Sequence, residues 1–342
     1  MVKTGANSKE NLLIFSNFVH LKISILHYEQ KKCPTCSSPI VKKDGKRKNV
    51  QRYKCMACGY RFSGGIKLTK EQIWEMYLQG KQTIAQISKS TGTSASTVTR
   101  RLATISFDWK QPKIKGSGVI HIDATYFGRN TGVLLALESE SGKLLYMKHI
   151  AHERVSDYLD AVNHIVRCGY TIQGIVIDGF QKLFTALSEY NLQMCQFHMV
   201  SIVRRKLTKN PKLEAGKELL NLAYRLKDMN QSAFVSEFER WKKKWHEFLK
   251  EKTVNEFTGR TIYTHQRLRS AMISISSYLP FLFTYENIKG MPNTNNMIEG
   301  TFTDMKKNLR NHPGMIKENR KRMINGFFLA YSQTHNTKGD NS

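Results

Sequence analysis

Acidic residues are scarce in this chain of 342 residues, which has 27 Asp and Glu against 54 Lys and Arg. The formal net charge is +27, and the basic excess is spread along the chain rather than confined to a tail. A folded protein this basic favours a polyanionic partner, most simply nucleic acid. An anionic membrane surface is the alternative, but no basic amphipathic helix in the sequence supports it. We therefore expect nucleic acid as the partner and no membrane.

Long hydrophobic runs are also lacking. The apolar stretch of residues 12–28 is shorter than the ~20 residues that a membrane-spanning helix needs, and His20, Lys22 and His27 interrupt it. No clear signal-cleavage pattern follows it. We expect an intracellular protein, cytoplasmic and associated with the nucleoid, and the sequence assigns no role to residues 1–30. The chain is 40% hydrophobic, which excludes a disordered polypeptide, and its length allows two or three domains.

Cysteine is sparse, and four of the six residues form two Cys-x-x-Cys pairs. Cys33 and Cys36 are separated from Cys55 and Cys58 by 18 residues (55 − 36 − 1), a spacing typical of a four-cysteine zinc site. Four thiolates complete a tetrahedral structural site, and paired cysteines of this kind argue for a reducing compartment rather than for disulfides. We predict a zinc ribbon over residues 31–66, with a structural Zn²⁺.

The segment between the two cysteine pairs is strongly basic. Residues 41–48 contain an Asp44-Gly45 dipeptide, which predicts a hairpin turn. Gly59, just past the second pair, suits the positive φ that cysteine knuckles often need. A basic hairpin can contact DNA, but a solvated charged loop is an equal alternative.

Residues 67–110 carry the pattern of three short helices. Thr69, Thr83 and Ser94 each stand where a helix N-cap is expected, and the third helix runs to Ile105. The arrangement is typical of a helix-turn-helix DNA-binding domain. The third helix exposes side chains able to reach bases or phosphates, namely Ser96, Thr97, Arg100 and Arg101. A small helical linker is the alternative.

A short strand, residues 119–126, contains one carboxylate among largely apolar residues. Side chains alternate along a strand, so Asp123 shares a face with His121 and Thr125. Burying a carboxylate without a partner is costly. Asp123 should therefore meet a metal ion, a cationic side chain or hydrogen-bond donors, and an ordinary Asp at a strand end is the alternative.

The next segments predict two antiparallel strands, a helix, a strand, a helix and a strand, over residues 132–138, 143–150, 157–166, 172–177, 182–188 and 192–197. This order resembles a ribonuclease H-like core, an α/β fold with a mixed five-stranded sheet, over residues 111–199. In that fold the first and fourth strands are neighbours, which would bring Asp123 beside Asp178. Two adjacent carboxylates repel unless a cation lies between them, and oxygen ligands favour Mg²⁺ or Mn²⁺.

The remainder of the chain divides in two. Residues 200–290 are basic with apolar residues at helical spacing, which predicts an all-α insertion with Trp241 and Trp245 in its core. Residues 291–342 would complete the sheet domain and end in a basic tail. A helix there carries Glu299 in its first turns, ordinarily no more than a favourable dipole contact. Its basic face, a candidate DNA contact, consists of Lys306, Lys307 and Arg310.

Several short motifs together resemble the Mutator-like transposases of bacterial insertion sequences. They are His-Ile-Asp-Ala-Thr-Tyr at Asp123, Val-Ile-Asp-Gly at Asp178, Cys-Gln-Phe-His at 195–198 and Thr-Asn-Asn-Met-Ile-Glu ending at Glu299. The resemblance covers residues 115–335, and the family's helical insertion between the second Asp and the Glu corresponds here to 121 positions (299 − 178). It implies a DDE enzyme in which these three acids hold two Mg²⁺ or Mn²⁺ ions to cut and join double-stranded DNA. Its substrates would be the element's terminal repeats and a target, and joining two ends implies at least a homodimer on DNA.

Cys195 and His198 form a Cys-x-x-His pair, which is half of a zinc site, with His164 and Cys168 as conceivable partners. The resemblance places the pair beside the catalytic acids, where His198 would hydrogen-bond near the metal ions or the scissile phosphate. A buried Cys and His satisfied by the protein is an equal alternative. The roles of Asn295 and Asn296, just before Glu299, are open, and Asn296 is a further supporting candidate.

Two other functions fit the same sequence. A DNA-binding regulator would use the zinc ribbon and the helix-turn-helix but need no metal at the carboxylates. A ribonuclease H-like nuclease would cut DNA without joining it. The presence of all three acids argues against the regulator, and the N-terminal DNA-binding modules make the nuclease less economical.

Overall fold

The computed structural model describes residues 32–336 except 34, 48–49, 64–68, 79, 81, 108, 113 and 255–258. Residues 1–30, to which the sequence assigns no role, lie outside the described part. The chain forms two compact units. One comprises Met1–Asp108 with Lys307–Thr334, and the other comprises Trp109–Lys306 with His335–Ser342.

The cysteine-rich segment forms three antiparallel strands in the order β1 (Val41–Arg47), β2 (Val50–Cys55), β3 (Arg61–Ser63). The prediction of a turn at Asp44-Gly45 is wrong, because both residues lie inside β1, where its pairing with β2 shifts register. Gly45 has a φ of 70°, which glycine adopts without strain, and Asp44 pairs with Arg61 across 3.0 Å. The connection between β1 and β2 falls on residues 48–49, outside the described residues. Gly59 has a φ of 72°, as the sequence predicts.

The three predicted helices follow as α2 (Lys70–Leu78), α3 (Ile84–Thr91) and α4 (Ala95–Ala103). Thr69 and Thr83 each exchange hydrogen bonds with a Gln three residues later, which makes a capping box. Ser94 caps α4 by accepting from the backbone N–H of Thr97, and Gly92 ends α3 with a φ of 66°. The helices close over a small core of Ile73, Ile87, Val98, Leu102 and Ile105.

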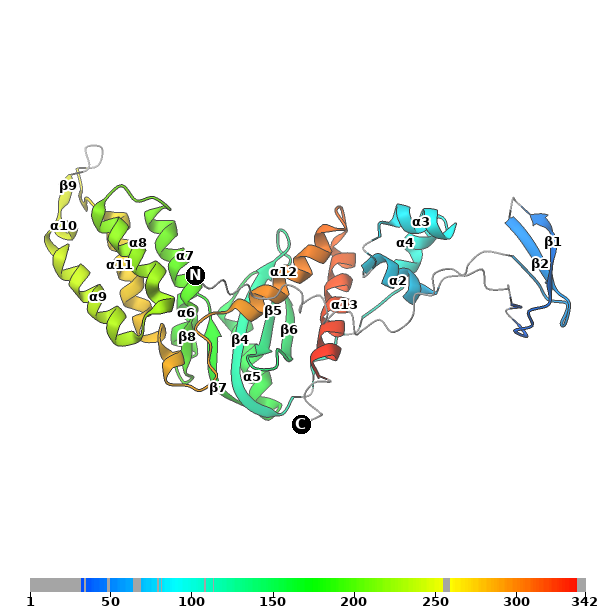
Figure 1. The fold of residues 1–342 in the computed structure, drawn as a ribbon, viewed down its shortest axis with the longest axis horizontal. Coiled ribbons are helices and arrows are strands. Elements are labelled where there is room, and N and C mark those ends of the chain that lie inside the picture. Colours follow the sequence, from blue (N-terminus) through cyan, green and yellow to red (C-terminus); the bar gives the residue numbers. More distant parts are fainter. Residues whose placement is uncertain are drawn as a thin grey trace, which may run out of the picture. The chain divides into compact units, whose positions relative to one another are not determined.

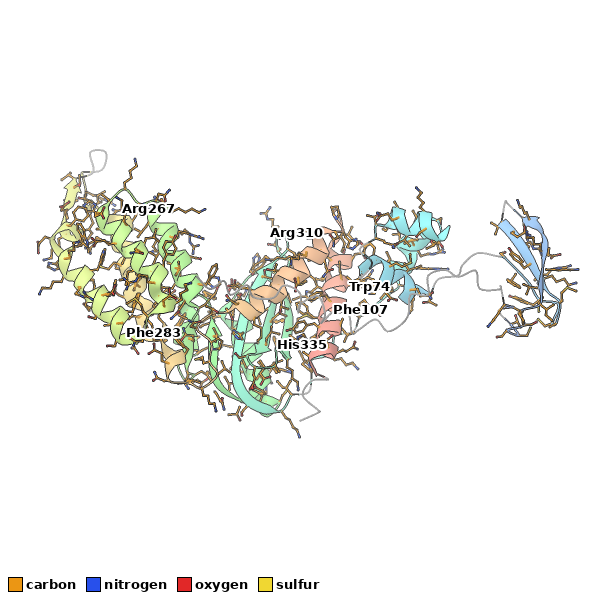
Figure 2. The ribbon with its side chains drawn as sticks, viewed as in Figure 1. Trp74, Phe107, Arg267, Phe283, Arg310 and His335 are labelled. Carbon is orange, nitrogen blue, oxygen red and sulfur yellow. The ribbon has the colours of Figure 1, made fainter. Side chains whose placement is uncertain are left out.

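The last helix, α13 (Lys317–Asn336), belongs to the same unit as these three helices over most of its length. The rings of Trp74 and Phe107 lie 4.9 Å apart (Figure 2), and a Cβ at Gly326 would come within 3.1 Å of both rings. Asn325 Nδ2 also donates to the carbonyl of Phe107 over 3.3 Å. Glycine therefore lets α13 approach the two rings closely. The segment 291–342, expected to complete the sheet domain, is divided between the two units at Lys306 and Lys307.

The second unit is built on a mixed five-stranded sheet (Figure 1). Its strands, in the order β6-β5-β4-β7-β8, are β6 (Leu144–Ile150), β5 (Gly132–Glu138), β4 (Gly116–Tyr126), β7 (Tyr170–Ile177) and β8 (Leu192–Met194). β4 pairs antiparallel with β5 and parallel with β7, and β7 pairs parallel with β8. With the helices α5 (Val155–Arg167) and α6 (Gln181–Ala186), this sheet fits a ribonuclease H-like core. β4, β5 and β7 are buried along most of their lengths, which explains their nearly continuous apolar sequences.

The predicted fifth strand, 192–197, is only half correct. β8 ends at Met194, and helix α7 (Gln196–Leu207) begins two residues later with Cys195 as its N-cap residue. The backbone N–H of Cys195 still donates to Ile177 at the end of β7, whereas that of Gln196 donates to Asn293. The chain thus leaves the sheet at Cys195, which places the Cys-x-x-His pair at a helix start rather than in a strand.

The insertion is a helical bundle beside the β8 edge of the sheet (Figure 1). After α7 it contains α8 (Glu214–Arg225), α9 (Gln231–Lys244), α10 (His246–Lys250) and α11 (Gln266–Tyr278), with short 3₁₀ turns at Leu226–Asp228, Leu279–Phe281 and Thr284–Glu286. The prediction of an all-α insertion is wrong in one respect, because β9 (Lys252–Val254) and β10 (Thr261–Tyr263) form an antiparallel pair within it. Trp241 is buried and donates to the carbonyl of Ala215, so it is a core residue, as predicted. Among the helices of the described residues, none is long and apolar enough to cross a membrane.

Candidate functional site

Asp123 and Asp178, called here the acidic pair, stand at the ends of two neighbouring parallel strands. β4 and β7 pair with Ile120 opposite Ile175 and His121 opposite Val176. The same register, continued by two residues, sets Asp123 opposite Asp178, which directly follows β7. Parallel pairing therefore brings together two carboxylates that are 55 positions apart in the sequence (178 − 123).

The acidic pair has little to offset its negative charge. Asp123 is 8% exposed, and its Oδ1 accepts only the N–H of Ala124 over 2.7 Å, while Asp178 accepts the N–H of Phe180 over 3.2 Å. Burial raises the pKa of Asp123 well above its usual value, and the charge of Asp178 raises it further. Neither aspartate forms an ion pair with a Lys or Arg in the described part of the chain. A cation is what this arrangement needs, and carboxylate oxygens fit Mg²⁺ or Mn²⁺.

A further carboxylate near the pair was missed by the sequence analysis. Glu153 lies just before α5, and the hydroxyl of Tyr158 donates to its Oε1 over 2.5 Å. Burial raises the pKa of Glu153, and the charge of Asp178 raises it further. The charge of Glu153 also contributes to raising the pKa of Asp123. The sequence signal was weak, because Glu153 lies in a short loop between a strand and a helix, where an acid is ordinary. Only the fold brings that loop to the ends of β4 and β7.

Glu299 lies in the first turn of α12 (Asn296–Arg310), as the sequence predicts. Its Oε1 is 3.5 Å from Nδ1 of His198, in the first turn of α7, and both side chains are 31% exposed. Cys195, at the start of the same helix, is fully buried, and burial raises the pKa of its thiol to about 11. The three side chains form what we call the Cys195–His198–Glu299 cluster.

Among the described residues, two groups of Cys, His or acidic side chains have all their ligand atoms within 4.8 Å of one another. One is the set of four cysteines, and the other is the Cys195–His198–Glu299 cluster. Glu299 therefore lies with the Cys-x-x-His pair rather than in a tight group with the two aspartates, although its charge contributes to raising the pKa of Asp123. His164 and Cys168 contact each other over 3.4 Å and belong to neither group.

Asn295, not Asn296, is the buried asparagine of this region. Asn295 is fully buried, its Oδ1 lies 2.6 Å from Nδ1 of His121 on β4, and its backbone N–H donates to Sγ of Cys195 over 3.3 Å. It thus links the central strand, α7 and the start of α12. Asn296, the supporting residue that the sequence predicts, is exposed. The alternation along β4 puts His121 on the same face as Asp123, but it does not indicate that the partner of His121 is Asn295.

Replacing Asn295 with Ala should destabilise the sheet-containing unit by about 1–3 kcal/mol, because the buried His121 would lose its hydrogen-bond partner. Asn296→Ala provides a matched control in the adjacent, exposed position and should change the free energy of unfolding by less than about 0.5 kcal/mol. Chemical denaturation measures both. Equal free energies of unfolding for the two variants would show that the contact between Asn295 and His121 contributes nothing to stability.

The four cysteines of the ribbon come together as the sequence predicts. The Sγ atoms of Cys33 and Cys58 lie 3.6 Å apart and those of Cys36 and Cys55 lie 3.5 Å apart, and all four are within 4.8 Å of one another. A tetrahedral zinc site with Zn–S bonds of about 2.3 Å has S···S separations of about 3.8 Å. The arrangement is compatible with a four-thiolate zinc site.

The candidate DNA-contacting side chains lie on two helices. On α4, Arg100 is exposed, while the hydroxyl of Thr97 already accepts from Ser94 over 2.9 Å within the helix cap. Arg101, the third candidate on α4, is only partly exposed. On α12, Lys307 and Arg310 are exposed and Lys306 is partly buried.

Comparisons with known proteins give little independent information. No protein-family model and no curated protein matches the chain. The Drosophila P element transposase strand transfer complex is 11% identical over 82% of this chain and 95% of that chain, with a TM-score of 0.39. The intasome of simian T-cell lymphotropic virus in complex with PP2A regulatory subunit B56 gamma is 10% identical over 59% of this chain and 65% of that chain, with a TM-score of 0.20. TM-scores this low carry no argument, so the functional conclusion depends on the residues of this chain.

Proposed function

We propose that this chain is a DNA transposase of the Mutator-like, DDE type, which cuts the ends of an insertion sequence and joins them to a target. The observation that carries the proposal is the parallel pairing of β4 with β7, whose register sets Asp123 opposite Asp178 at a buried strand end. Carboxylates in such a position are costly unless they bind a cation, and paired acids on a ribonuclease H-like sheet suit metal-assisted phosphoryl transfer.

Asp123, Asp178 and Glu299 would hold the catalytic ions, Mg²⁺ or Mn²⁺. Bound there, such ions would activate water or a DNA 3′-hydroxyl as the nucleophile and stabilise the leaving oxygen. Asp123 and Asp178 supply rigid ligands, because each is fixed by a backbone N–H at the end of a strand. Glu299 lies in the first turn of a helix and is partly exposed, so its side chain is free to turn toward the pair. His198, 3.5 Å from Glu299, would position that carboxylate.

The basic surface would supply the DNA contacts. In our proposal the zinc ribbon and the α2–α4 helices read the terminal repeats, with Thr97, Arg100 and Arg101 on the third helix. Lys306, Lys307 and Arg310 on α12 would contact the phosphate backbone near Glu299. Because two ends must be joined together, the active species on DNA would be a homodimer or a larger assembly.

The direct test uses the full-length chain with Mg²⁺ and DNA that flanks its gene on both sides. A transposase should nick this DNA at a defined position and join the released 3′-hydroxyl to a plasmid target. Removal of Mg²⁺ by EDTA should stop both steps. Cleavage without joining would identify a nuclease instead.

The second candidate is a DNA-binding regulator with an inactive sheet domain. The position of Glu299 beside Cys195 and His198, outside a tight group with the acidic pair, favours it. Specific binding to the flanking DNA, with no cleavage in Mg²⁺ or Mn²⁺, would establish the regulator. Phosphate-contacting residues should then still give a steep loss of affinity with salt.

A further inference from the structure

The Cys195–His198–Glu299 cluster joins three kinds of metal ligand from two helix starts. Cys195 and His198 come from the first turn of α7, and Glu299 comes from the first turn of α12. Their ligand atoms lie within 4.8 Å of one another, and the pair Nδ1 of His198 and Oε1 of Glu299 is separated by 3.5 Å. Ligands of one tetrahedral zinc ion lie about 3.3–3.8 Å apart, so a small inward movement would bring all three onto one ion.

The same place holds an unusual concentration of unsatisfied polar atoms. His198 Nδ1 and Glu299 Oε1 are both shielded from solvent, yet neither makes a hydrogen bond. Nδ2 of Asn295, the residue that contacts Cys195, is also buried without a partner. A buried polar atom without a partner destabilises the fold, because it has lost its hydrogen bonds to water. A bound ion would satisfy the imidazole nitrogen and the carboxylate oxygen at once, and Asn295 Nδ2 could donate to a further oxygen ligand.

The supporting contacts hold the two helix starts in a fixed relation. The backbone N–H of Asn295 donates to Sγ of Cys195, and N–H groups near a sulfur stabilise its thiolate form. Gln196 and Asn293 are joined twice, through the backbone of Gln196 to the carbonyl of Asn293 and through their side chains over 3.0 Å. Both helices are thereby fixed to each other directly next to the three ligands. Such a second layer of contacts is what orients the ligands of a metal site.

We propose that Cys195, His198 and Glu299 bind a zinc ion, with the fourth coordination position open to water or to a DNA phosphate. A set of one sulfur, one nitrogen and one oxygen ligand selects Zn²⁺ over Mg²⁺, because thiolate and imidazole are poor partners for hard cations. Three protein ligands with an open position are the pattern of an accessible zinc site rather than of a closed structural one. The site is separate from the four cysteines of the ribbon and needs neither His164 nor Cys168.

Zinc bound there would hold the carboxylate of Glu299 on the α7 side, away from Asp123 and Asp178. This consequence rests on the proposed transposase reaction, in which Glu299 completes the magnesium site. The zinc site itself does not rest on it, so its test needs no DNA and no catalysis.

For the test, the full-length chain is first loaded with Zn²⁺, and free zinc is then removed by gel filtration in metal-free buffer. Mass spectrometry measures the number of zinc ions that remain bound per chain. The wild type should hold one more zinc per chain than Cys195→Ala or His198→Gln. Glu299→Gln should weaken the same site by about tenfold or more. Cys168→Ala is the matched control and should hold as much zinc as the wild type, since Cys168 contacts a histidine but belongs to no three-ligand group in the described part of the chain.

A second measurement separates the new site from the ribbon. In a background with Cys33→Ser, Cys36→Ser, Cys55→Ser and Cys58→Ser, Co²⁺ loaded in place of zinc should show absorption from a single thiolate ligand, and the further change Cys195→Ala should remove it. His198 is 31% exposed, so His198→Gln should keep the wild-type circular dichroism and report binding rather than folding. Equal zinc content in the wild type, Cys195→Ala and His198→Gln would overturn the proposal, as would a Co²⁺ spectrum unaffected by Cys195.

Discussion

Replacing Asp123 with Asn should lower magnesium-dependent DNA cleavage by about 10³-fold or more, because the reaction would lose several kcal/mol of transition-state stabilisation. The same change should raise the free energy of unfolding of the metal-free protein. Asn keeps the shape of Asp and can still accept the N–H of Ala124 through its side-chain oxygen. It removes the charge that the fold buries beside Asp178. A residue that costs stability and is required for activity is typical of a functional site.

The stability gained by Asp123→Asn should depend on pH, and the direction of that dependence follows from the pKa of Asp123. Burial and the charge of Asp178 raise the pKa of Asp123 in the folded protein well above 3.8, its ordinary value. Below pH 3.8 the carboxyl is protonated in both states and costs nothing. As pH rises from there through the higher pKa of the folded state, the unfolded chain loses its proton first, and wild-type stability falls. The advantage of Asp123→Asn should therefore be absent at the acid end, grow over this window and be complete above it.

Denaturant titrations in EDTA over that pH range would measure the difference between the two proteins. Adding Mg²⁺ should stabilise the wild type and leave Asp123→Asn unchanged, because only the wild type offers the ion its full ligand set. Asp160→Asn is a suitable control. Asp160 is 57% exposed and bonded to Lys148, so its replacement should leave cleavage and the Mg²⁺ response as they are. Full cleavage by Asp123→Asn would rule out the acidic pair as the catalytic centre.

The sheet could be predicted from the sequence because its strands are apolar, short and separated by clear turns. The predicted range 132–138 is that of β5, and the predicted 119–126 lies within β4. The prediction that Asp123 lies beside Asp178 depends on the resemblance of the element order to a ribonuclease H-like core, in which the first and fourth strands are neighbours. The prediction of the fifth strand was wrong at its end, because it was based on local sequence alone. The apolar residues at 192–197 were assigned to one strand, although the contact of Cys195 with the start of α12 ends the strand early.

The composition of the site could be predicted only in part. Only the family resemblance places the Cys-x-x-His pair beside the catalytic acids, and nothing in the spacing of residues 195–198 and 299 indicates that the pair meets Glu299 in particular. Their contact depends on two helix starts that converge in space across an insertion of about 90 residues, which no local pattern encodes. The contacts of Asn295 could not be predicted for the same reason, because its partners His121 and Cys195 come from a strand and a helix far away in the sequence.

Removing the zinc that we propose for the four cysteines should unfold β1, β2 and β3 while the helices α2–α4 keep their structure. The physical reason is that the ribbon has almost no core of its own. Among the described residues from 33 to 63, only Cys33 and Cys55 are buried. Stacked rings of Tyr53, Tyr60 and Phe62 add contacts at the surface, with centroids 5.9 and 6.4 Å apart, but exclude little water. The α2–α4 helices, by contrast, close over their own apolar core.

Zinc binding to four thiolates is worth about 10–16 kcal/mol in small domains that fold around the ion, more than any other contact in the ribbon can supply. Amide hydrogen exchange should therefore show protection of the ribbon strands collapsing in a strong chelator or in Cys55→Ser, with protection of α2–α4 retained. Cys168→Ser is the matched control, because Cys168 is partly buried but belongs to no cluster of four thiols, and it should leave the ribbon protected. Ribbon strands that stay protected without metal would mean that the four cysteines hold the fold by some means other than zinc. DNA binding by Cys55→Ser would then separate the ribbon's contribution to recognition from that of the helices, because this change removes a ligand of the ribbon alone.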